Sequence, residues 1–132
     1  MQNIDYSLSL EILESDIWSE PNYNSHLFTR CHELRKIPLN QFTVEDLRIL
    51  IGQNLSLDYL IPIAIERLEN DPWCRGDFYD GDLLKNVLKI NSEYWKHHPD
   101  LFYRLSEIMD RVFFQIETFE KILLPAWKNM NK

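Results

Sequence analysis

Glycine, valine and threonine are scarce in this sequence of 132 residues, with three of each. Leucine and isoleucine are abundant, with 19 and 13, and they recur at spacings of three and four residues. The shortage of valine and threonine argues against strands, while that spacing favours helices. We therefore expect an all-α fold: a single compact domain over residues 1–132, with about six or more helices around one core.

Cysteine is also rare, and the two that occur, Cys31 and Cys74, are far apart in the sequence. They form no metal-binding or redox motif, which fits a reducing compartment. The four histidines are His26, His32, His97 and His98. No two of them are four residues apart, the spacing that would let a pair on one helix bind zinc. We expect no metal and no cofactor.

Long hydrophobic runs are missing as well. No apolar stretch approaches the roughly 18 residues that suggest a membrane span. The first ten residues, MQNIDYSLSL, lack the basic region and the apolar core of a secretory signal. We expect a cytoplasmic protein that does not bind membranes.

Basic residues are in the minority, and the formal net charge is −7. Direct binding to nucleic acid depends on lysine and arginine to neutralise phosphates, so this charge argues against it. The acidity is concentrated in residues 1–70, which hold eleven acidic and five basic residues. Such a field can attract a basic partner, or it can serve solubility alone. Charge by itself leaves both explanations open.

Several helices can be placed from their boundaries. The stretch SLDYLIPIAIERLEN, residues 56–70, is apolar almost all round, which is typical of a helix at the centre of a core. Thr43 and Asp46 resemble a capping box at the start of another helix. A long helix is predicted to begin at Pro99 and to stop at Pro125. Its apolar stripe consists of Leu101, Leu105, Ile108, Val112, Ile116, Phe119 and Leu123.

The stretch DPWCRGDFYDGDLL, residues 71–84, is the densest cluster of acidic and aromatic residues. It does not match a calcium-binding EF-hand loop. Whether Gly76 or Gly81 is taken as the glycine at position 6 of such a loop, residues without a suitable side-chain oxygen occupy positions that must bind the ion. Asp80 is a good N-cap for a helix that begins near Gly81, and Asp82 would lie in its first turn. Gly76 can take a positive φ. Phe78 and Tyr79 are expected to hold the loop against the core.

Capping does not account for Asp77, so the same loop can also serve as a contact surface. A catalytic use of its aspartates would need a pocket that shifts one pKa. The other catalytic alternative is a nucleophilic Cys31 paired with a histidine that is distant in sequence. A cysteine on the apolar face of a helix is more often an inert core residue.

The order of motifs resembles a known family. The segments EDLRILIGQ, residues 45–53, and GDFYDGDLL, residues 76–84, are similar to segments of the all-helical immunity proteins of bacterial contact-dependent growth inhibition systems. The similarity extends from about Trp18 to about Ile108. One departure is Asp80, where the family pattern often has proline. Both residues suit the start of a helix.

The resemblance implies a cytoplasmic protein that catalyses nothing. Such a protein binds the C-terminal toxin domain of a delivered effector, usually a nuclease, in a 1:1 complex and occludes it. A nuclease that holds phosphates is basic in its groove, so an acidic inhibitor is a suitable partner. A ribonuclease is the expected target.

The family pattern does not supply the contact residues, so we predict them from charge and expected exposure. The predicted set is Glu14, Asp16, Glu20, Asp77, Tyr79, Asp80 and Asp82. Two alternatives remain from other classes of protein. One is a small helical enzyme that uses Cys31, His32 or the loop Asp77–Asp82. The other is a helical adaptor for a partner that is not a toxin.

Overall fold

The computed structural model describes residues 3–19 and 25–130. Within these ranges the regular structure is helical, and no strand forms apart from two isolated β-bridges. The all-α prediction is therefore confirmed. Contacts between residues divide the chain into two compact units, Met1–Ile90 and Asn91–Lys132. The single domain over residues 1–132 stays a prediction.

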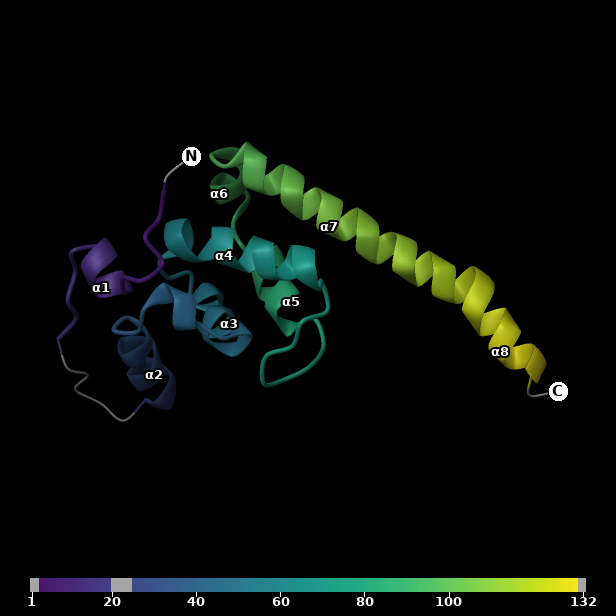
Figure 1. The fold of residues 1–132 in the computed structure, drawn as a ribbon, viewed down its shortest axis with the longest axis horizontal. Helices are drawn as coiled ribbons and strands as arrows, with labels where there is room; N and C mark the ends of the chain where they lie inside the picture. Colours follow the sequence, from purple (N-terminus) through teal and green to yellow (C-terminus); the bar gives the residue numbers. More distant parts are fainter. Residues whose placement is uncertain (1–2, 20–24, 131–132) are drawn as a thin grey trace. The chain divides into compact units, whose positions relative to one another are not determined.

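The first unit contains five α-helices and one short 3₁₀ helix among its described residues (Figure 1). In chain order they are α1 (Leu10–Leu13), α2 (His26–Leu34), η1 (Leu39–Gln41), α3 (Val44–Gly52), α4 (Leu57–Asn70) and α5 (Asp82–Leu88). Helix α3 lies at the centre, because it contacts α2, α4 and α5.

The core of this unit is built mainly by α3, α4 and α5. Helix α4 is apolar almost all round, as predicted, and its fully buried side chains include Leu60, Ile61, Ile65 and Leu68. Burying one such side chain contributes about 1.5–3 kcal/mol, so this helix supplies much of the stability of the unit. Pro62 lies inside α4.

The start of α3 is fixed by a complete capping box, which confirms the prediction at Thr43. The Asp46 backbone N–H donates to the Thr43 hydroxyl at 3.1 Å, and the Thr43 N–H donates to the Asp46 carboxylate at 3.0 Å. Arg30 also donates to Asp46, at 3.0 Å. These contacts hold the start of α3, which carries Glu45 in its first turn and Arg48 in its second.

The second unit contains α6 (Ser92–Lys96), α7 (Pro99–Thr118), a π-helical turn η2 (Phe119–Leu123) and α8 (Leu124–Met130). Pro99 begins α7, as predicted. The predicted stop at Pro125 is wrong, because helical structure continues to Met130. A proline inside a helix removes a hydrogen bond and crowds the carbonyl four residues earlier. Here that residue is Lys121, which lies in the wider π turn, so the proline is accommodated.

Candidate functional site

The loop between α4 and α5, residues 71–81, presents an acidic and aromatic surface. Its tip consists of four consecutive exposed residues, Asp77, Phe78, Tyr79 and Asp80. The Asp80 side chain is 73% exposed and lies 3.9 Å from Arg75, so its charge faces solvent. The structure therefore makes three of the predicted contact residues, Asp77, Tyr79 and Asp80, neighbours on one surface.

Asp82 holds this loop in place from beneath. Its side chain is only 3% exposed, and its two oxygens accept three backbone hydrogen bonds. The N–H of Gly76 donates at 2.7 Å, that of Phe78 at 3.0 Å and that of Tyr79 at 3.4 Å. Burial raises the pKa of the Asp82 carboxyl, but these hydrogen bonds outweigh burial and leave its pKa below the ordinary value. Asp82 is a positioning residue for the tip.

Two residues of α3 complete the support. Arg48 donates two hydrogen bonds to the Glu45 carboxylate, both at 2.6 Å, and Glu45 accepts the backbone N–H of Asp77 at 2.8 Å. The hydrogen bonds from Arg48 are the largest cause that lowers the pKa of Glu45. Our sequence prediction named neither residue, although both lie in the segment EDLRILIGQ. We call Glu45, Arg48 and Asp82 the platform.

The glycines of the loop have roles different from those predicted. Gly81, with φ of +95°, is the N-cap of α5, so the predictions of Asp80 as the cap and of a positive φ at Gly76 are wrong. Gly76 is needed for a close approach instead. A Cβ atom there would collide with Glu45 and lie 3.0 Å from an oxygen of Asp82.

The loop aromatics face outward rather than into the core. Phe78 is 62% exposed and Tyr79 is 45% exposed, so the prediction that they anchor the loop on the core is wrong. The Phe78 ring covers the Arg48 guanidinium at 4.3 Å. Phe78 therefore packs on Arg48 instead of on the core, and the rings of Phe78 and Tyr79 stay accessible to a partner.

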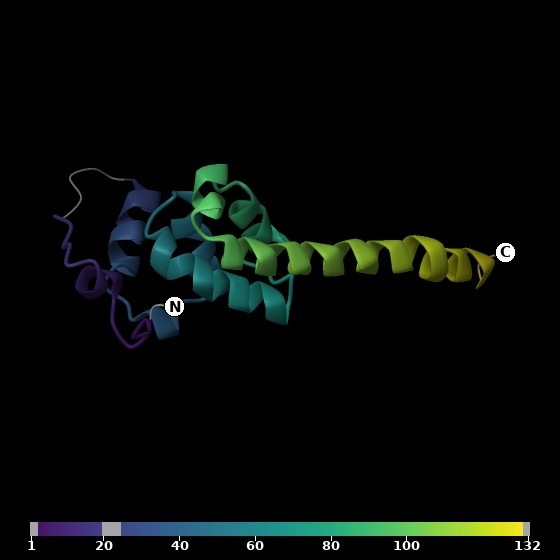
Figure 2. The same cartoon turned by 90° about the horizontal axis from the view of Figure 1, so that it is seen from above.

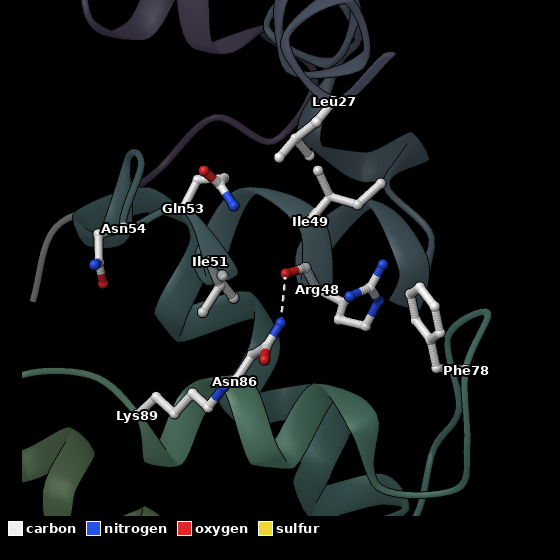
Figure 3. Close-up of a pocket in the computed structure, with 10 residues that line it drawn as sticks. Leu27, Arg48, Ile49, Ile51, Gln53, Asn54, Phe78, Asn86 and Lys89 are labelled. Carbon is white, nitrogen blue, oxygen red and sulfur yellow. Dashed lines mark hydrogen bonds between the residues drawn. The ribbon is translucent and has the colours of Figure 1, made fainter. Parts of the chain in front are cut away.

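A pocket of about 470 Å³ opens beside the platform (Figure 3). Leu27, Ile49 and Phe78 supply apolar walls, and Arg48, Asn86 and Lys89 are among its polar residues. The Asn86 amide donates to the backbone carbonyl of Arg48 at 2.9 Å, which joins α5 to α3. The pocket can accept a partner's side chain next to the acidic tip.

The predicted N-terminal acids lie elsewhere. Glu14 accepts a 2.5 Å hydrogen bond from the buried Arg35, and Ser56 donates to it at 3.0 Å. The Asp16 side chain is 65% exposed, while its backbone carbonyl accepts a hydrogen bond from Arg35 at 2.7 Å. Glu14 is thus a structural partner of Arg35, and Asp16 is the more accessible acid. Glu20 lies outside the described residues.

These acids are not brought together with the loop. Helix α1 lies at one end of the first unit and the α4–α5 loop at the other, in both views of the ribbon (Figures 1 and 2). The predicted contact residues therefore form two separate patches. Asp82, which is buried, can act on a partner only through the loop that it supports.

Two residues of the enzyme alternative, Cys31 and His32, are unfavourably placed for chemistry. Cys31 is 4% exposed, and burial raises the pKa of its thiol, which disfavours the reactive thiolate. His32 is also buried, with its Nε2 3.2 Å from the backbone oxygen of Trp18. Across residues 3–19 and 25–130, no group of three or more histidine, cysteine or acidic side chains could hold a metal ion.

The described helices include none with the length and apolar character needed to cross a membrane. Comparison with curated proteins and with solved structures gave no match. A family model described as CDI immunity proteins matches residues 12–105, which is more than half of the chain. That range includes both segments that build the platform and the tip. The chain therefore belongs to the family of CDI immunity proteins, where CDI stands for contact-dependent growth inhibition.

Proposed function

We propose that this protein binds the C-terminal toxin domain of its cognate growth-inhibition effector in the cytoplasm, one chain to one toxin. The toxin is a nuclease, with a ribonuclease as the leading target, and binding occludes its active site or its substrate surface. Family membership supports an immunity role in general. The observation that carries the finer proposal is the exposed acidic and aromatic tip at Asp77–Asp80.

The chemistry of the tip suits a basic nuclease groove. Asp77 and Asp80 supply negative charge that attracts a phosphate-binding surface and speeds encounter. Phe78 and Tyr79 supply rings that can be buried in a pocket of the partner and slow dissociation. The platform fixes these four residues in one arrangement, so charge and apolar surface reach the partner together.

The first experiment mixes the purified protein with the toxin domain encoded beside it and measures RNA cleavage and complex formation in the same samples. A tight complex with loss of cleavage is the expected result. Binding without inhibition would instead indicate the adaptor alternative. The absence of binding would contradict the proposal for that pair of proteins.

Single charge reversals then separate the two acidic patches. Asp80→Lys and Asp16→Lys are a matched pair, because their side chains are similarly exposed, at 73% and 65%. We expect Asp80→Lys to slow association about 3- to 10-fold at low salt, and Asp16→Lys to change it little. The reverse outcome would move the contact surface to the N-terminal patch. Equal rates for both variants and the wild type would exclude both patches.

The aromatic contribution is tested separately, through the dissociation rate. Tyr79→Ala removes a half-exposed ring without altering the platform, and we expect dissociation to be about tenfold faster. Cys31→Ala is the control for the enzyme alternative. An immunity protein should keep full protection with Cys31→Ala, or lose it only in proportion to lost stability.

A further inference from the structure

Residues 113–130, which we call the tail, carry an unusual amount of exposed apolar surface. Eight large apolar side chains are each at least two-fifths exposed: Phe113, Phe114, Ile116, Phe119, Ile122, Leu123, Trp127 and Met130. Scattered exposed apolar residues need no explanation, but a continuous group of this size marks an interaction surface. The tail lies beyond residue 105, where the match to the family ends.

The tail continues an apolar stripe that begins earlier in α7. Leu101, Leu105, Ile108 and Val112 are buried. The same spacing of three and four residues then leads through Ile116, Phe119, Leu123 and Trp127, which are all exposed. A stripe of this kind predicts that a second apolar surface covers its whole length. The exposed part of the stripe begins at Ile116.

The charges of the tail identify the kind of partner. The tail holds two acidic and two basic residues, Glu117, Glu120, Lys121 and Lys128. Glu117 and Lys121 pair with each other at 2.8 Å. The tail is therefore neutral in a chain of net charge −7. A basic toxin or an anionic surface gains no electrostatic attraction here, whereas another copy of the tail meets no repulsion.

The exposed apolar area on the stripe side of the tail is in the range of a small self-association interface. We take about 200 Å² for a fully exposed aromatic side chain and somewhat less for an aliphatic one. The side chains on the stripe side of the helix, Ile116, Phe119, Leu123, Trp127 and Met130, then present on the order of 500 Å². That is close to the roughly 600 Å² that each partner contributes at the lower end of stable interfaces. A twofold axis uses the same patch on both copies, so one self-complementary surface is enough.

We propose that the tails of two copies of this chain pack against each other and form a symmetric dimer in solution. Phe119, Leu123 and Trp127 lie in the stripe and would form the centre of the contact. The inference does not depend on the identity of the toxin. With one toxin bound by each chain, the complete assembly would contain two copies of each protein.

The test measures the mass of the full-length protein by light scattering and sedimentation, at about 1 to 100 μM. We expect twice the 16.0 kDa of one chain at the higher concentrations. Phe119→Asp with Leu123→Asp should raise the dimer dissociation constant at least about 100-fold, because two charges would be buried unpaired. The helical content measured by circular dichroism should not change.

The matched control is Ile12→Asp with Ile17→Asp, which alters two exposed apolar residues of the first unit. This control should remain dimeric. A wild type that stays monomeric at about 100 μM would overturn the proposal, and so would a Phe119→Asp, Leu123→Asp variant that stays dimeric. If the wild type were monomeric and this variant lost toxin binding, the tail would belong to the toxin interface and the dimer would be excluded.

Salt separates this proposal from the proposed function. Dimerisation through apolar side chains should be unchanged or slightly stronger at high salt. Capture of a basic toxin should become slower. A monomeric variant that still neutralises the toxin would support the tail as a separate interface, whereas a dimeric wild type that binds no toxin would contradict only the proposed function.

Discussion

Asp82 shows how one buried carboxylate can set the conformation of a whole loop. Its oxygens accept the backbone N–H groups of Gly76 and Phe78 at 2.7 and 3.0 Å. Asp82→Asn replaces one acceptor oxygen with an amide group that faces a donor. We expect the free energy of unfolding to fall by about 1–3 kcal/mol in urea titrations. Asp80→Asn, at an exposed position, should change it by less than about 0.5 kcal/mol.

The platform also predicts the response to acid. The pKa values of Glu45 and Asp82 lie below their ordinary values of 4.5 and 3.8 in the folded protein. The unfolded chain therefore binds more protons in this range, so their contribution is complete above the ordinary values and is lost as pH falls. We expect urea titrations from about pH 6 to pH 3 to show a steeper loss of stability for the wild type than for Glu45→Gln with Asp82→Asn. Equal slopes would mean that these two carboxylates are not linked to folding.

Gly76 permits a close approach between the loop and α3. A Cβ atom at this position would collide with the Glu45 carboxylate, which is held by Arg48. Gly76→Ala should therefore lower the free energy of unfolding by about 1–2 kcal/mol and weaken the bond from Asp77 to Glu45. A double-mutant cycle with Glu45→Ala provides the control. Gly76→Ala should cost less when Glu45 is absent, and purely additive effects would contradict the collision.

At the scale of single residues, the sequence predicted local roles well and distant contacts poorly. The place of Asp82 in the first turn of α5 could be predicted, because the helix dipole favours a negative charge there. Its three backbone partners could not, since they depend on how the loop folds back. The contact between Glu45 and Asp77 joins positions 32 apart, and no spacing rule connects them. The assignment of Asp80 as the N-cap failed because Gly81 can take the positive φ that ends the loop.

Among the helices, α3 decides whether the platform exists, because it carries both Glu45 and Arg48. Its start depends on the Thr43 capping box. Thr43→Ala should lower the free energy of unfolding by about 1 kcal/mol, whereas Thr43→Ser should retain most of it. Thermal and urea unfolding of the two variants would measure this. Similar losses for both would show that packing of the threonine methyl group, rather than capping, is responsible.

The helices themselves were largely predictable, because apolar spacing and capping residues are local signals. The largely apolar pattern of α4 and the proline at the start of α7 both led to correct assignments. The end of the last helix was not predictable from the same signals. Pro125 normally stops a helix, but a π turn just before it changes the backbone geometry, and that turn has no clear sequence marker.

At the scale of the whole molecule, net charge should control how fast the toxin is captured. The chain carries a net charge of −7, and the tip places two of its exposed acids, Asp77 and Asp80, close together. We expect association with the toxin to slow at least about tenfold between roughly 50 and 500 mM salt. Dissociation should change much less, because contacts already buried are poorly screened. Stopped-flow mixing at several salt concentrations would measure both rates, and a salt-independent association rate would contradict steering.

The separation of the two acidic patches could not be foreseen from sequence. The predicted contact set included both Asp16 and Asp77, and charge and composition carry no information about whether their segments meet. The fold puts α1 and the α4–α5 loop at opposite ends of the first unit (Figure 2). The resemblance to the immunity family was more informative at this scale, since the match over residues 12–105 establishes the family without locating the contact surface.

The hydrogen bonds that hold the loop have a consequence for the thermodynamics of recognition. The backbone N–H groups of residues 76–79 already donate within the protein, to Asp82 and Glu45. A loop preorganised in this way loses little conformational entropy when a partner arrives. Binding should then proceed in a single kinetic phase. Its heat-capacity change should match the docking of rigid surfaces, without the larger value that accompanies coupled folding.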